Sequence, residues 1–158
     1  FNQNVRVNIM KIVLQDNPKY LSIDMAEDQN ASFDVPATWL GDYYPSWIPE
    51  GMRLRQLICQ PGIPGGSVVF GGDEEFPKVD FTELSDSGRM NVDSENATQE
   101  NITINGHSAL LLEKTTFFKN RQLKFIIWCD GYRNFVVSSI ELPREELIRF
   151  AEGIRRIE

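Results

Sequence analysis

Residues 122–140 read QLKFIIWCDGYRNFVVSSI and decide the fold class. From Leu123 to Ile127 every second residue is apolar, which places one apolar face on an extended strand. Asp130-Gly131 then interrupts the run, and Asp-Gly is favoured in type I′ hairpin turns because both central residues need positive φ. The stretch therefore predicts two antiparallel strands joined by a tight turn.

The same turn chemistry recurs upstream of this hairpin. Asn105-Gly106 separates Ile102–Ile104 from His107–Lys114, and Asn-Gly is again typical of a type I′ turn. The polar residues 85–99 before it are expected to form a long surface loop. Three further strand-like runs are bounded by Gly, Pro or acidic residues; they are Met52–Cys59, Ser67–Phe70 and Phe76–Leu84.

Downstream of the hairpin, Pro143–Ile157 has the spacing of a helix. Its apolar residues recur at i, i+3, i+4 and i+7; they are Leu147, Phe150, Ala151 and Ile154. Because a sheet must bury its apolar face, we expect this stripe to pack on it. The predicted fold class is α+β, a mostly antiparallel β-sheet of about six to eight strands with a C-terminal α-helix packed on one face.

The 158 residues suit a single domain, 1–158, in which three segments can be distinguished. Residues 1–34 are predicted to be an N-terminal hairpin extension, because Val5–Gln15 and Tyr20–Met25 alternate like strands around a turn. Residues 35–51 are a connection rich in proline and aromatic residues. Residues 52–158 hold the sheet and the C-terminal helix.

The connection at 35–51 contains the candidate ligand-binding residues. Its three prolines are incompatible with a regular central strand or a long helix. Its four large aromatic residues are Trp39, Tyr43, Tyr44 and Trp47. These rings either pack on the body of the domain or form a platform on which a ligand stacks, and the sequence leaves both interpretations open.

Charge and composition exclude several classes of function. The formal net charge of −7 disfavours binding to nucleic acid, whose phosphates such a chain repels. His107 is the only imidazole and follows a tight turn, so no catalytic residue is predicted. We also predict no cofactor and no metal: the acidic residues at 73–75 and in 86–95 are expected to be solvated and not to bind Ca²⁺. Cys59 and Cys129 are expected to be buried free thiols, with a disulfide as the alternative.

Five stretches, in order, resemble a bacterial family known as domain of unknown function 4367. They are YPSWIPEGM at Tyr44–Met52, DSENAT at Asp93–Thr98, ITINGH at Ile102–His107, IIWCDGY at Ile126–Tyr132 and LPREELIRFAEGI at Leu142–Ile154. The likeness runs from Tyr44 to Ile157. Trp47 and Met52 stand where the family's pattern has Tyr and Phe.

The resemblance implies a domain outside the membrane, in some cases in proteins that resemble anti-sigma factors, with a membrane anchor that we expect upstream of Phe1. The first hypothesis is therefore a non-enzymatic extracytoplasmic sensor or interaction domain of a membrane-anchored bacterial regulator, with a protein or small ligand as its unknown partner. The alternative is a secreted small-ligand or glycan-binding module that uses the aromatic platform. A hydrolase using acidic residues is a third hypothesis, based on carboxylate abundance alone.

Overall fold

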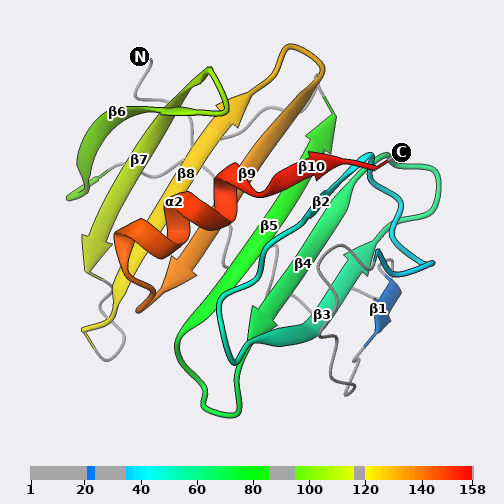
Figure 1. Cartoon of the computed structure of the whole chain (residues 1–158), viewed down its shortest axis with the longest axis horizontal. Helices are drawn as coiled ribbons and strands as arrows, with labels where there is room; N and C mark the ends of the chain where they lie inside the picture. The colour runs from blue at the N-terminus through cyan, green and yellow to red at the C-terminus, as the bar shows by residue number, and fades with distance from the viewer. Residues whose placement is uncertain (1–20, 24–34, 86–94, 116–119, 158) are drawn as a thin grey trace.

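The computed structural model describes residues 21–23, 35–85, 95–115 and 120–157. The larger of its two sheets has eight strands in the order β1-β3-β4-β5-β9-β8-β7-β6 (Figure 1). Every neighbouring pair in this sheet is antiparallel. The strands are β1 (Leu21–Ile23), β3 (Arg53–Cys59), β4 (Gly66–Gly71), β5 (Lys78–Ser85), β6 (Thr98–Ile104), β7 (His107–Thr115), β8 (Gln122–Cys129) and β9 (Arg133–Ile140).

A second layer covers one face of this sheet. It consists of helix α2 (Arg144–Glu152) and a two-stranded sheet in which β2 (Tyr43–Pro45) pairs antiparallel with β10 (Ile154–Arg156). The helix lies across β8 and β9, and β10 continues from it across β5 toward β2 (Figure 1). The predicted fold class is thereby confirmed: a mostly antiparallel sheet with a C-terminal helix packed on one face.

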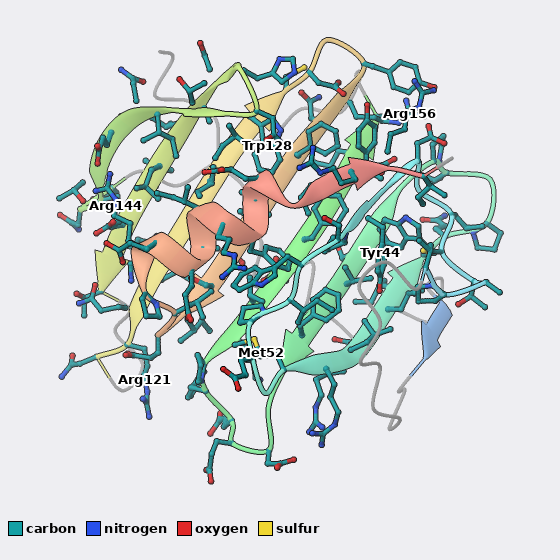
Figure 2. All side chains as sticks on the ribbon, in the orientation of Figure 1. Tyr44, Met52, Arg121, Trp128, Arg144 and Arg156 are labelled. Atoms are coloured by element: carbon teal, nitrogen blue, oxygen red, sulfur yellow. The ribbon has the colours of Figure 1, made fainter. Side chains whose placement is uncertain are left out.

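The two ends of the large sheet differ in what they carry. The turns at 60–65 and 130–132 lie at the same end, because Gly66 pairs with Glu83 and Ser85 pairs with Arg133. We call this the turn end. Arg156 lies at the turn end, whereas Met52 and Arg121 lie toward the other (Figure 2).

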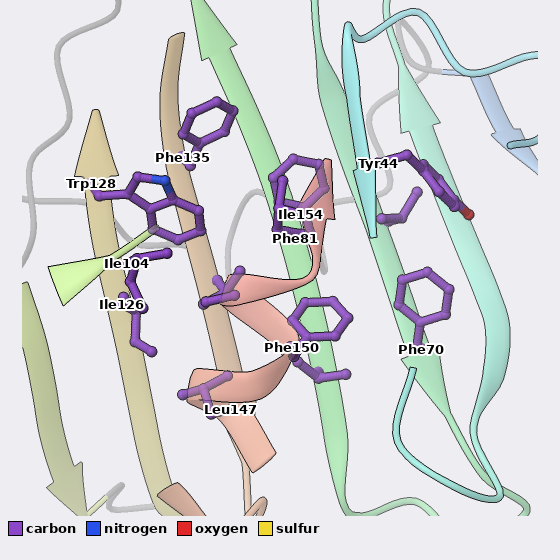
Figure 3. Close-up of a cluster of buried hydrophobic side chains, with 14 of the residues drawn as sticks. Tyr44, Phe70, Phe81, Ile104, Ile126, Trp128, Phe135, Leu147, Phe150 and Ile154 are labelled. Atoms are coloured by element: carbon purple, nitrogen blue, oxygen red, sulfur yellow. The ribbon is translucent and has the colours of Figure 1, made fainter. Parts of the chain in front are cut away.

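The large sheet is apolar on both faces. On the covered face, α2 inserts Leu147 and Phe150 against the strands, and the ring centroids of Phe70 and Phe150 are 5.9 Å apart (Figure 3). We call this the helix-side core. The other face carries a separate group of buried apolar side chains, the opposite-face cluster; its members are Val69, Leu110, Leu112, Leu123, Phe125, Ile127, Val136 and Ile140.

One of the two predicted type I′ turns is confirmed and the other is wrong. Asn105 and Gly106 both have positive φ, 49° and 84°. At the second turn only Gly131 does, at 90°. There Asp130 Oδ1 accepts hydrogen bonds from the backbone N–H groups of Tyr132 and Arg133, each at 2.8 Å. The aspartate side chain thus organises a three-residue turn, and β9 begins at Arg133.

The predicted helix over Pro143–Ile157 is too long at its C-terminal end. Helix α2 ends at Glu152, and Gly153 donates its N–H to the carbonyl oxygens of Arg149 and Phe150. Gly153 sits so close to Trp47 that an added Cβ would lie 3.3 Å from the Trp47 Cβ. The chain then turns into β10, where Ile154 keeps its predicted place in the helix-side core.

Several predictions for the N-terminal part lie outside the described residues. These include the first strand of the predicted hairpin extension and half of the second. The described half, β1, pairs with β3. The central part of the predicted polar loop also lies outside, and β6 already begins at Thr98. Both cysteines are free thiols, but only Cys59 is buried. Cys129 is exposed, because it ends β8 beside the turn, so the prediction that it is buried is wrong.

Candidate functional site

The candidate site is built around a buried carboxylate, Glu83, near the end of β5. Alternation along β5 places Val79, Phe81 and Glu83 on the same face, so the carboxylate points into the helix side of the sheet and its side chain has no exposed surface. Its oxygens accept the backbone N–H of Asp42 at 2.9 Å and that of Tyr43 at 2.8 Å. Burial raises the pKa of Glu83, and these two N–H groups act in the opposite direction.

Arg133 completes this arrangement from the first position of β9. Its Nε lies 3.3 Å from Glu83 Oε2, and its Nη2 lies 2.9 Å from Asp42 Oδ2. The guanidinium therefore joins two strands of the large sheet to the connection at 35–51. We call Asp42, Glu83 and Arg133 the clasp. Because both Glu83 oxygens accept hydrogen bonds from the connection or from Arg133, this carboxylate holds the connection in place.

Beside the clasp, Tyr43 reaches the 130–132 turn. Its hydroxyl donates to Asp130 Oδ2 at 2.5 Å, and its ring meets that of Phe135 edge to face at 4.7 Å. Burial, followed by the hydrogen bond to Asp130, raises the pKa of Tyr43 to about 12. For Asp130 burial acts upward, but the hydrogen bonds from Tyr43 and from the turn's backbone outweigh it and lower the pKa. Tyr43 thus stays protonated and Asp130 ionised at neutral pH.

Tyr132 presents the exposed surface of this site. It is 47% exposed, although it is a large aromatic residue. The guanidinium carbon of Arg133 lies 4.2 Å from its ring centroid, and that of Arg156 lies 5.5 Å away. Cations at such distances from a ring are attracted by its π system. The ring is therefore held in place by its neighbours while much of its surface stays open to solvent.

The four aromatic residues predicted from the sequence do not gather on one surface. Trp39 is 7% exposed and Tyr44 is 2% exposed, and their rings meet edge to face in the helix-side core. Trp47 is half-buried, with the Arg149 guanidinium 4.2 Å from its ring centroid. Tyr43, also half-buried, is the one member that reaches the clasp. The packing interpretation accounts for Trp39 and Tyr44, and a ligand-binding role for the four residues stays a prediction.

Sequence reasoning missed the other members of the site. The signal for Glu83 was present, since KVDFTEL places this carboxylate at an apolar-facing position of an alternating strand. No comparable signal marks Arg133 or Asp42, because their contact spans 91 positions of the chain. Asp130 could be recognised as a turn residue, but its bond to Tyr43 could not.

A second buried carboxylate, Asp80, lies on the other face of the sheet. It is 6% exposed, and the Ser138 hydroxyl donates to its Oδ2, whereas its Oδ1 has no hydrogen-bond partner among the described residues. Burial raises the pKa of Asp80 to about 7, and the bond from Ser138 limits the increase. Nearby, Ser67 and Thr82 satisfy each other with a 2.7 Å hydrogen bond. Asp80 is therefore a protonated or half-protonated acid near neutral pH.

Other sequence-based candidates have ordinary surroundings. Of the acidic residues at 73–75, Asp73 forms an exposed ion pair with Arg53 at 2.9 Å. Over the described ranges, no three His, Cys, Asp or Glu side chains are placed to hold a metal ion. His107 is the half-buried first residue of β7 and lies close enough to Asp130 for their charges to interact.

Comparison with known proteins gives one match. A family model described as "Domain of unknown function (DUF4367)" matches residues 42–154. No curated protein and no solved structure matches the chain. In the part of the chain that the structure describes, no helix combines the length and the apolar character needed to cross a bilayer.

Proposed function

The chain belongs to the family of domain of unknown function 4367, and we propose that it is a non-enzymatic sensor or interaction domain of a membrane-anchored regulator, placed outside the cytoplasmic membrane. The regulator would be of the kind that resembles an anti-sigma factor. The domain would recognise a protein or a small ligand and would not transform it.

The observation that carries the non-enzymatic part is the clasp. Glu83 is a buried carboxylate in contact with Arg133, which covers the exposed Tyr132 ring, and such a position is where an acid or base would be expected. Yet its two oxygens are taken up by the N–H groups of Asp42 and Tyr43 and by Arg133. A carboxylate satisfied in this way positions its neighbours. What it positions is the partly exposed Tyr132–Arg133 pair, which suits recognition.

The location can be tested with the two free thiols, because they differ in exposure. Cys129 is exposed and Cys59 is buried, and burial also raises the pKa of the Cys59 thiol. Intact cells expressing the full-length protein would be treated with a membrane-impermeant maleimide. If the domain is outside the membrane, we expect the protein to be labelled in intact cells, and labelling to be lost in Cys129→Ser but kept in Cys59→Ser. Labelling of Cys129 only after lysis would contradict the proposed location.

A further inference from the structure

The large apolar side chains that the described part exposes are concentrated at one end of the sheet. They are Leu40, Ile63 and Tyr132, which are 45%, 50% and 47% exposed. Single exposed apolar residues are common on protein surfaces and need no explanation. Here, however, Ile63 lies in the turn at 60–65 and Tyr132 in the turn at 130–132, both at the turn end. Leu40 joins them because its carbonyl oxygen accepts the N–H of Gly65 at 3.4 Å.

These three residues lie on one connected border. Two positions after Leu40, Asp42 forms the ion pair with Arg133, whose guanidinium in turn covers the Tyr132 ring. The segment 40–42 thus connects the Ile63 turn with the Tyr132 turn through contacts of its own. We call Leu40, Ile63, Tyr132 and Arg156 the rim.

The rim also carries a positive charge, that of Arg156. Arg156 is exposed at the turn end, with its guanidinium carbon 5.5 Å from the Tyr132 ring centroid (Figure 2). As far as the described residues extend, Arg156 pairs with no carboxylate. Arg155, its neighbour in β10, is exposed as well. Although the chain has a formal net charge of −7, the Arg156 guanidinium offers an acidic group a partner at this position.

We propose that the rim is a docking surface for a segment of another protein in which an Asp or Glu side chain is flanked by apolar side chains. The acidic side chain would pair with Arg156, and the apolar ones would cover Leu40, Ile63 and Tyr132. Tyrosine and arginine are enriched among residues that dominate protein–protein binding energy. The Tyr132 ring is already held by its neighbours, so less conformational freedom is lost on binding.

The charges at the rim favour a protein segment over the other surfaces that such a border could meet. The carboxylates of Asp42 and Asp130 lie beside Tyr132, and both would face the phosphates of an anionic bilayer. A second copy of the chain would bring the same net negative charge to the contact. A short acidic and apolar segment avoids both kinds of repulsion, because it carries few charges and its carboxylate can be directed at Arg156.

This inference rests on the proposed interaction function and can be tested on the purified chain. A phage-displayed library of random peptides would be selected against it. We expect the selected peptides to combine Asp or Glu with large apolar residues. Tyr132→Ala, Ile63→Ser and Arg156→Glu should each weaken binding of the selected peptides by about tenfold or more, as expected for dominant contacts. Arg55→Glu makes the same charge change away from the rim and should leave binding unaltered.

Each other outcome has a definite meaning. If the three rim variants bind the selected peptides as tightly as the wild type does, recognition takes place elsewhere on the chain. The rim proposal would then be wrong, whereas the proposed interaction function would stand. A chain that selects no peptide but binds vesicles of phosphatidylglycerol and phosphatidylcholine, or that sediments as a dimer disrupted by Tyr132→Ala, would overturn the proposal in favour of a membrane or a second copy. The thiol-labelling result, which tests the location of the domain, does not depend on whether the rim binds a peptide, a vesicle or a second copy. Thermal unfolding of each variant checks that the substitution leaves the fold intact.

Discussion

Replacing Asp80 by asparagine should remove a large pH dependence of stability. Asp80 lies in β5 on the face of the opposite-face cluster, where it is 6% exposed and one of its oxygens finds no hydrogen-bond partner within the described ranges. Its pKa in the folded protein is raised by burial to about 7, whereas its ordinary value is 3.8. Asparagine has nearly the same shape but does not ionise, so Asp80→Asn isolates the contribution of this one titration.

The sign and size follow from the two pKa values. Between pH 3.8 and about 7 the folded state holds a proton on Asp80 that the unfolded state has released. The free energy of unfolding therefore falls as the pH rises through this interval. The stabilising contribution is complete below about pH 4 and lost above about pH 7. Since one pKa unit corresponds to about 1.4 kcal/mol, Asp80 should account for a loss of about 4 kcal/mol across the interval.

Urea unfolding of wild type and variant between pH 4 and 8, followed by tryptophan fluorescence, measures this loss directly. We expect Asp80→Asn to gain stability over wild type as the pH rises, with the difference levelling off above about pH 7. Asp73→Asn makes the same chemical change at a side chain that is 89% exposed, and its profile should parallel the wild type. If the Asp80→Asn profile also runs parallel to the wild type between pH 4 and 7, burial does not raise the pKa of Asp80 and the reasoning is wrong.

Four further substitutions, one of them a control, test the fold and the clasp by urea unfolding at neutral pH. Gly65→Ala should cost about 2 kcal/mol or more, because Gly65 has φ +96° and an added Cβ would lie 2.3 Å from the Glu83 carbonyl oxygen; Gly62→Ala, at φ +83° with open space around it, should cost only about 1 kcal/mol. Glu83→Gln should lower the free energy of unfolding by about 2 kcal/mol, because it weakens the charge-assisted hydrogen bonds from Arg133 and two backbone N–H groups. An unchanged urea midpoint would show that the clasp contributes nothing to stability. Phe150→Asp should cost about 4 kcal/mol, because it buries an unpaired carboxylate in the helix-side core; a stability equal to wild type would refute the packing of α2.

The features predicted well from the sequence are those fixed by local chemistry. Asn105-Gly106 satisfies a turn that needs two residues with positive φ, and both have it. Leu147 and Phe150 share one face of any helix that includes them, and both are fully buried against the sheet. In each case the physical cause acts within a few residues, so the pattern and the structure agree.

The features that were missed depend on partners far along the chain. Ile154 fits a helical stripe as well as it fits a strand. The structure forms a strand because Ile154 pairs with Pro45 and Arg155 pairs with Tyr44. At the 130–132 turn, a side-chain carboxylate replaces the backbone geometry that Asp-Gly favours. Glu83 could be recognised as an acid on an apolar face, but the sequence does not reveal that Asp42 and Arg133 meet it.

The clasp and the proposed docking surface are physically coupled. Leu40 belongs to the connection at 35–51, whereas Tyr132 belongs to the β8–β9 turn, so no local geometry fixes their separation. Their relative position depends on the contacts of Glu83 and Arg133 with Asp42, which hold the connection against the large sheet. Glu83 has no exposed surface and cannot touch a partner. The buried Glu83 carboxylate therefore orders two exposed apolar groups from distant parts of the chain and holds them on one border at the same end of the sheet.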